Sequence, residues 1–306
     1  MAVLSAACSW AWPRDAAASE GDGSRVELAF ELADTVEKGL ARENGAEFMR
    51  PLRRSSRLWR FNVVRSEDKL EYRLLSDDGA FLMYAHVSVA DRRARLYLYD
   101  RLDKLHDPSR PAFSLIFCEA RSDWRLVQER CDNCGHQPRH LSCTELGRQQ
   151  VAAVQHYKET VGGGVRNAMH VQVPGIYADG GQVVWCPRLG RGDLAQPEAD
   201  AGSPAAGSPA AGSPSPAESR RARKERLFLV SRRPEWSSDA QSLILDFRGR
   251  SVVSSAKNFQ LALRQKPDHV ICQFGKLAEG TFALDFKYPL SVVQAFGICI
   301  TTLFWT

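Results

Sequence analysis

Short segments in which apolar and polar side chains alternate recur along most of this 306-residue chain. In the clearest one, Trp59, Phe61 and Val63 alternate with Arg60 and Asn62, a period of two that places the apolar side chains on one face of a strand. Turn sequences such as Ser-Asp-Asp-Gly at residues 76–79 separate the segments. The other candidate strands are residues 72–75, 81–89, 96–99, 113–117, 125–127, 154–157, 169–173, 183–186, 227–230, 243–247, 269–274 and 281–286. Roughly a dozen short strands with few helices predict a mainly β fold, either a barrel or a sandwich.

Residues 288–306 contain no charged residue, and their length approaches that of a membrane-spanning helix. Several polar residues shorten the uninterrupted apolar run below a comfortable span, namely Pro289, Ser291, Gln294, Thr301 and Thr302. The alternatives are therefore a membrane anchor and a helix buried in a protein core, which is also apolar all round.

The first residues have a different composition. Residues 1–23 are rich in Ala, Ser, Gly and Asp and poor in large side chains, which predicts a disordered leader. Ser24 and Glu27 have the spacing of a capping box, and apolar residues then recur at helical spacing until Asn44 and Gly45. We therefore predict an amphipathic helix within residues 24–45. We expect it to pack on the main domain, and the alternative is a helix that recruits a partner.

A low-complexity segment interrupts the strands at residues 193–219, where the sequence GSPAA occurs twice in tandem from Gly202 and Gly207. Small residues and prolines bury too little apolar area to offset the entropy of ordering, so we predict a disordered insert. A basic cluster follows it, formed by Arg220, Arg221, Arg223, Lys224 and Arg226. This cluster has three interpretations: contact with anionic lipid, a nuclear signal, or a solvated end of the loop.

Five side chains that ligate metals in other proteins lie close together in the sequence: Cys131, Cys134, His136, His140 and Cys143. A CxxC pair followed by His and Cys can complete a tetrahedral structural zinc site that would rigidify this loop. The alternative is a set of free thiols and solvated histidines. The eight cysteines of the chain are spread too widely for the disulfide framework of a small secreted domain, which favours an intracellular protein with reduced thiols.

Common catalytic signatures are absent from the sequence, since it contains no GxxxxGK[ST], HExxH or GxSxG. We therefore predict a protein that is not an enzyme. The composition, with 44% hydrophobic and 25% charged residues, is that of an ordinary globular protein. The net charge of +5 is too small to predict a dedicated nucleic-acid binder.

Two long motifs in the last quarter carry a resemblance. The first is Phe-Arg-Gly-Arg at residues 247–250 followed by Ser-Ala-Lys-Asn-Phe-Gln at 255–260, and the second is Gln-Ala-Phe-Gly-Ile at 294–298. They are similar to the tubby-family signatures FxGRVTxASVKNFQ and Gln-Ala-Phe-(Ala/Gly)-Ile. Upstream, residues 148–154 (RQQVAAV) resemble the family's RQELAAV, and Val-Pro-Gly at 173–175 and Pro-Glu-Trp at 234–236 also match. The resemblance covers about residues 47–302, interrupted by the insert.

The resemblance implies a closed antiparallel β-barrel of about twelve strands at residues 47–306, around a buried hydrophobic C-terminal helix. Under this interpretation the uncharged segment is the core helix and not a membrane anchor. Tubby-like domains bind phosphoinositides of the inner plasma membrane. They act as adaptors that carry membrane cargo toward cilia, or as scaffolds when they are linked to other modules.

The headgroup site that the resemblance implies is only partly matched. The family uses a Lys-x-Arg on a middle strand together with the arginine that opens RQELAAV, and Arg148 matches that arginine. The middle strand corresponds to residues 113–124, which have no Lys and Arg at the required positions. Arg121 and Arg125 lie close by as substitutes, unless they are only surface arginines. The family's basic run after an earlier strand is reduced to Arg92, Arg93 and Arg95. The family's closing Lys-x-Ala-Cys-Glu is replaced by Thr-Thr-Leu-Phe-Trp-Thr at 301–306.

These observations predict a monomeric adaptor that binds phosphoinositide headgroups and partners in membrane trafficking or scaffolding. We expect it in the cytoplasm, at the periphery of the plasma membrane or cilium. One alternative is a protein-interaction scaffold, in ubiquitin ligation or trafficking, that has lost lipid binding. The other is a nuclear regulator that uses the basic cluster.

Overall fold

The computed structural model describes residues 45–98, 111–129, 148–161, 164–177, 180–186, 193–195, 225–238 and 242–305. The predicted leader at 1–23 lies outside these ranges, as does the predicted helix at 24–45 apart from Gly45. Both of these stay predictions.

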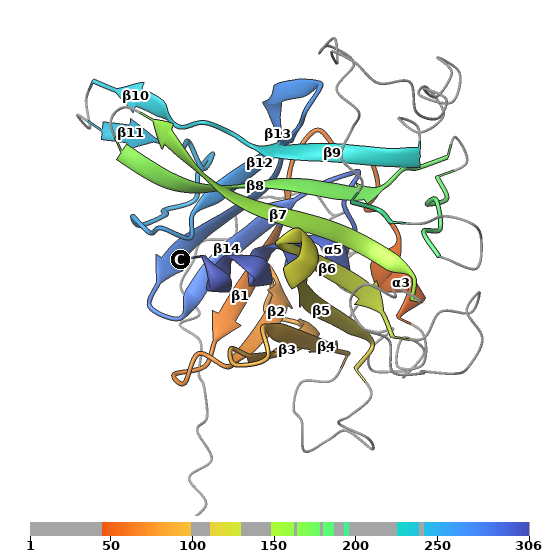
Figure 1. The fold of residues 1–306 in the computed structure, drawn as a ribbon. Helices are drawn as coiled ribbons and strands as arrows, with labels where there is room; N and C mark the ends of the chain where they lie inside the picture. The colour runs from red at the N-terminus through yellow and green to blue at the C-terminus, as the bar shows by residue number, and fades with distance from the viewer. Residues whose placement is uncertain are drawn as a thin grey trace, which may run out of the picture.

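Twelve antiparallel strands form a closed barrel in the described residues, in the order β1-β14-β13-β12-β9-β8-β7-β6-β5-β4-β3-β2 (Figure 1). Their bounds are β1 Trp59–Arg65, β2 Glu71–Ser76, β3 Phe81–Ser88, β4 Arg93–Tyr97, β5 Phe113–Cys118, β6 Asp123–Gln128, β7 Gln150–Val161, β8 Gly164–Pro174, β9 Arg226–Ser231, β12 Phe259–Leu263, β13 Lys266–Ala278 and β14 Thr281–Phe286. Two further short strands, β10 Glu235–Ser237 and β11 Ser242–Ile244, form a separate two-stranded sheet. The predicted closed barrel is therefore confirmed.

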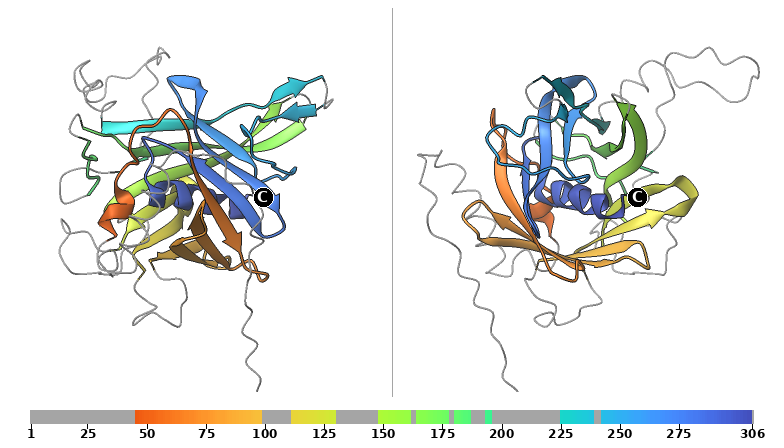
Figure 2. Two further views of the ribbon diagram at one scale, coloured as in Figure 1. Left: turned by 180° about the vertical axis from the view of Figure 1, so that it is seen from behind. Right: turned by 90° about the vertical axis from the view of Figure 1, so that its left-hand side faces the viewer.

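The uncharged C-terminal segment forms helix α5 Val292–Thr301, which passes through the barrel and is surrounded by strands (Figure 2). Every residue of this helix is buried. Ser291 and Gln294 close a capping box at its start, and Gln294 also donates to the Val151 carbonyl oxygen of β7 at 3.1 Å. A 3-10 turn, η4 Thr302–Phe304, continues the helix. The predicted core helix is confirmed, and among the described helices none is long and apolar enough to cross a bilayer.

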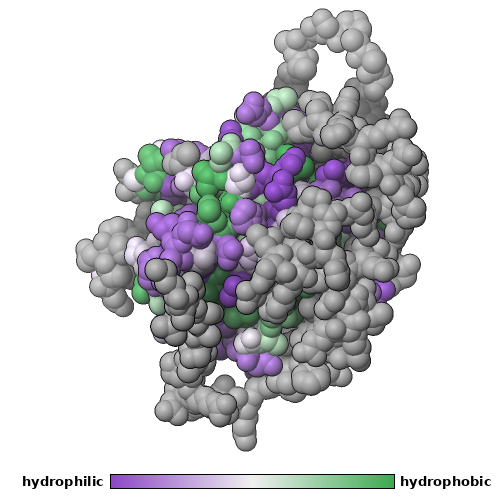
Figure 3. Space-filling view, turned by 90° about the horizontal axis from the view of Figure 1, so that it is seen from below, coloured by the Kyte–Doolittle hydropathy of each residue, from purple (hydrophilic) through white to green (hydrophobic). Residues whose placement is uncertain are grey.

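Close packing around α5 depends on small residues and on a second short helix. A Cβ atom at Gly297 would lie 2.8 Å from a methyl carbon of Leu126 in β6, so glycine permits the helix to approach the wall. Helix α3 Ala46–Met49 closes the end of the barrel at which α5 begins, with Phe48 fully buried. On the outer face shown in Figure 3, apolar residues occur in small groups among hydrophilic ones, as expected where strands alternate between core and solvent.

An aromatic cluster closes the other end of α5. His156 of β7 lies 3.0 Å from the Thr301 hydroxyl oxygen, and its ring meets Trp305 edge-on at 5.7 Å. The Thr301 hydroxyl donates to the Ile298 carbonyl oxygen, so His156 Nε2 is the donor in the contact with Thr301. Burial lowers the pKa of His156 from 6.5 to about 4.

The lowered pKa of His156 predicts a pH-dependent stability. Between pH 6.5 and about 4 the unfolded chain binds a proton that the native imidazole does not, so stability should fall as the pH falls through this window. The full shift corresponds to about 3 kcal/mol. Denaturant melts across this range should show that the free energy of unfolding falls more for the wild type than for His156→Gln as the pH is lowered. His269→Gln, an exposed histidine, serves as control. Parallel pH profiles for the wild type and His156→Gln would contradict this account.

Candidate functional site

Arg148, the residue that matches the family's headgroup arginine, lies two positions before the start of β7. The backbone bond from Gln128 N to Gln149 O, 2.9 Å long, brings it next to Glu129 at the end of β6. Arg148 Nη1 contacts both carboxylate oxygens of Glu129, at 2.7 and 2.8 Å. The Arg148 side chain keeps 26% of its surface exposed. It is therefore a partly exposed cation that one carboxylate, Glu129, holds in place among the described residues.

Arg125 has a different environment. Its side chain has no exposed surface. Its Nε and Nη2 donate to the two oxygens of Asp123 at 2.8 and 2.7 Å, and it also forms an ion pair with Asp193. Burial raises the pKa of Asp123 and lowers that of Arg125. Either charge would therefore destabilise the folded protein if its partner were removed. Two carboxylates already occupy the donors of Arg125 in this arrangement, which disfavours a contact with a headgroup; that contact stays a prediction.

The segment next to Arg125 is Asp193, Leu194 and Ala195, which belongs to the predicted disordered insert. Leu194 is fully buried, and its N–H donates to the side chain of Gln150 at 2.9 Å. The predicted start of the insert at Asp193 is therefore wrong. Asp193 is the counter-ion of a buried arginine, and this role requires an ordered backbone. Residues 196–219 lie outside the described residues.

Two other predicted residues join the same cluster. Arg121, which is half-exposed, also forms an ion pair with Asp193. Arg226 of the basic cluster donates to the Asp193 carbonyl oxygen at 3.2 Å and stacks over the ring of Trp185 at 4.3 Å. Arg226 thus has a structural role. The other four members of the basic cluster lie outside the described residues.

The structure brings Arg121 and Arg125 together through Asp193, but it places Arg148 elsewhere. Glu129, the partner of Arg148, follows Arg125 by four positions, which is roughly 13 Å along a strand. The predicted zinc ligands between Cys131 and Cys143 lie outside the described residues, so the zinc site stays a prediction. Among the residues that the structure does describe, no group of three metal-ligating side chains is gathered.

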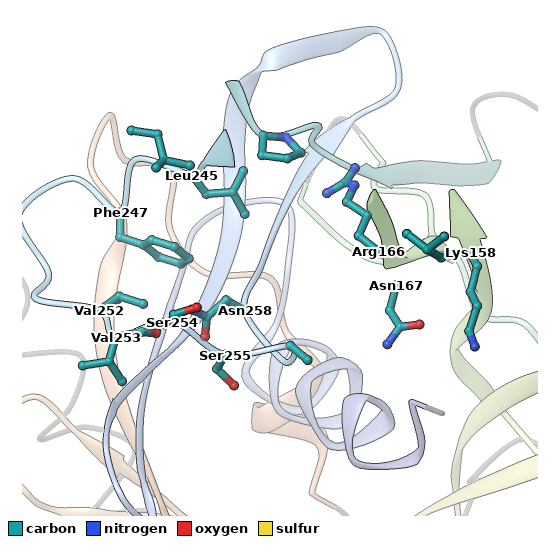
Figure 4. A pocket seen from close by; sticks show the side chains of 14 residues that line it. Lys158, Arg166, Asn167, Leu245, Phe247, Val252, Val253, Ser254, Ser255 and Asn258 are labelled. Atoms are coloured by element: carbon teal, nitrogen blue, oxygen red, sulfur yellow. Dashed lines mark hydrogen bonds between the residues drawn. The ribbon is translucent and has the colours of Figure 1, made fainter. Parts of the chain in front are cut away.

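Sequence reasoning missed a groove of about 690 Å³ at the far end of β7 and β8 (Figure 4). One wall carries Lys158, Arg166 and Asn167, and the opposite wall is the loop that contains Phe247 and Val253. Three side chains that line it are unusually exposed for apolar residues: Val165 at 69%, Ile244 at 43% and Val253 at 46%. No local motif indicates the groove, because its walls come from segments about 90 residues apart in the sequence.

Comparisons of the sequence with known proteins support the family that the motifs resemble. The family model described as the Tub family matches residues 115–304, which is more than half of the chain. This chain belongs to the Tub family. Human Tubby-related protein 3 is 31% identical over 155 residues, which cover 51% of this chain and 30% of that protein. Tubby protein homolog 1 of Caenorhabditis briggsae is 45% identical over 74 residues, covering 24% and 18%. Tubby-like F-box protein 6 of rice is 40% identical over 87 residues, covering 26% and 22%. The matched stretches span less than a third of each of these relatives.

Proposed function

We propose that this Tub-family chain is a non-enzymatic adaptor that binds phosphoinositide headgroups at the inner membrane face through Arg148, with Arg121 as a second contact. Membership of the family supports the adaptor role. Its cargo would be membrane proteins, carried toward cilia.

One observation supports the choice of Arg148: its side chain is 26% exposed, and in the described part of the chain its guanidinium is held by one carboxylate, that of Glu129. A phosphomonoester carries a charge of about −1.5 to −2 and has three acceptor oxygens, so it can compete with one carboxylate for this guanidinium. Arg121 shares Asp193 with a buried arginine, so its contribution should be smaller.

Sedimentation of the full chain with vesicles tests this proposal. Vesicles of phosphatidylcholine with bis-phosphorylated phosphatidylinositol should bind the wild type. Arg148→Ala should weaken this binding by a factor of about ten to a hundred, because a hydrogen bond to a charged group contributes about 1.5–3 kcal/mol. Arg57→Ala, which removes an exposed arginine before β1, should bind like the wild type. Equal sedimentation of the wild type with plain phosphatidylcholine vesicles would rule out the lipid function.

A protein-interaction scaffold without lipid binding is the second candidate. The observation that favours it is that all three arginines predicted to contact a headgroup already form ion pairs with carboxylates. The carboxylates are those of Glu129, Asp123 and Asp193. In that case a pull-down should recover the same partners with the wild type and with Arg148→Ala. The nuclear alternative depends mainly on cluster residues outside the described part of the chain, and it stays a prediction.

A further inference from the structure

The groove at the end of β7 and β8 lies beside a free strand edge. β8 pairs with β9 only from His170 to Pro174, while its pairing with β7 continues to Gly164. The earlier half of β8 therefore has a strand neighbour on one side only, among the described residues.

The direction of the backbone groups along β8 follows from two hydrogen bonds. Met169 N donates to the Ser231 hydroxyl oxygen at 2.9 Å, and Gly175 N donates to the Glu225 carbonyl oxygen at 2.7 Å, both on the β9 side. The N–H and C=O of one residue in an antiparallel strand point to the same side, and this side alternates with each residue. The pairing of β7 with β8 shows no register shift. Val165 and Asn167 therefore direct their N–H and C=O groups away from β7, toward the open edge.

The opposite wall of the groove is held firmly in place. A Cβ atom at Gly275 of β13 would lie within 2.7 Å of Val252 and 3.0 Å of Phe247, so glycine lets this loop lie directly on the sheet. Arg250 in the same loop donates to Asp285 of β14 at 2.7 Å and 3.1 Å. The groove is thus a preformed feature that needs little reorganisation before it binds a ligand.

The charged side chains that line the groove have one sign among the described residues. They are Lys158 and Arg166, and no described Asp or Glu lines the groove. Arg166 is already engaged by Glu159 and by the Arg232 carbonyl oxygen, whereas Lys158 is exposed. Lys158 is therefore the cation available to a ligand.

We infer that this groove binds an extended peptide segment of a partner protein, which adds as a strand to the free edge of β8. Alternate apolar side chains of the peptide would cover Val165, Ile244 and Val253, and an acidic residue would face Lys158. Unpaired N–H and C=O groups at strand spacing select a peptide backbone, and the exposed apolar side chains and Lys158 select its side chains. The inference rests on the proposed adaptor role and names the class of its protein partner.

The two surfaces of such an adaptor are well separated. Arg148 precedes the start of β7 at Gln150, and Lys158 lies near its other end, roughly 26 Å further along the strand. A membrane contact at Arg148 would therefore leave the groove accessible to a partner.

Fluorescence anisotropy with the full chain tests the inference. The probe is a labelled pool of peptides of about eight residues, with Val, Ile or Leu at alternate positions and Asp or Glu between them. In a matched pool, Lys replaces the acidic residues. We expect the acidic pool to bind at least about tenfold more tightly than the Lys pool, and Lys158→Glu to reverse this preference.

Two variants locate the binding on the chain. Asn167→Pro removes an N–H that points away from β7, so it should block strand addition while the pairing of β7 with β8 remains. Val253→Asp places a charge on an exposed apolar contact. Each should weaken binding of the acidic pool at least about tenfold, whereas Val89→Asp, at a valine outside the groove that is more exposed than Val253, should not. Thermal melting verifies that the variants are folded.

Several outcomes would overturn the inference. One is that Asn167→Pro and Val253→Asp both bind the acidic pool as tightly as the wild type does. Another is that the wild type binds the two peptide pools equally. A third is that the chain forms a dimer and that Asn167→Pro abolishes it. The last outcome would mean that a second copy occupies the edge. Arg148→Ala should bind the peptides like the wild type, so a failure of the lipid function and a failure of the groove can be told apart.

Discussion

Replacing Phe296 by alanine is expected to lower the free energy of unfolding by about 3–5 kcal/mol. Phe296 is fully buried in the middle of α5, where the wall of the barrel surrounds the helix. Truncation removes the transfer free energy of the ring and also leaves a cavity, because twelve hydrogen-bonded strands cannot collapse inward to fill it.

Urea denaturation of Phe296→Ala beside the wild type measures this loss. Val89→Ala is the control, since Val89 is 64% exposed in a turn and its loss should stay within about 0.5 kcal/mol. A loss of less than about 1 kcal/mol for Phe296→Ala would show that the helix does not fill the barrel.

Replacing Arg125 by methionine should destabilise the protein by a similar amount, about 3–5 kcal/mol. The substitution keeps most of the side-chain volume but leaves Asp123 without the cation that faces both of its oxygens, while Asp193 keeps its ion pair with Arg121. Asp123 is almost fully buried, so an uncompensated charge there cannot recover its hydration.

A second variant separates the charge from the packing. Arg125→Met combined with Asp123→Asn and Asp193→Asn removes all three charges and should recover at least half of the lost stability. This stable variant should also bind phosphoinositide vesicles at least as tightly as the wild type, because Asp193→Asn releases Arg121 from its ion pair. If Arg125→Met alone were stable and lost lipid binding, Arg125 would be a headgroup contact after all.

The two arginines show how far local sequence can identify a binding site. Arg148 was matched by a motif, and its side chain keeps 26% of its surface exposed. Arg125 lies nearby in the sequence and has the same chemistry, yet it is buried. Its environment is set by Asp193, 68 residues further along the chain, which no local pattern connects to it.

The closed barrel and its central helix were determined by the sequence itself. A period of two in the strands, an uncharged segment at the end and the two family motifs are local features, and burial of apolar surface converts them into this fold. The tertiary structure alone decided which arginines keep exposed surface, that residues 193–195 are ordered against β6 and β7, and where β8 leaves β9. Each of these depends on contacts between segments far apart in the chain, such as Arg125 with Asp193 and Gly275 with Val252, and such pairings form only when the barrel closes.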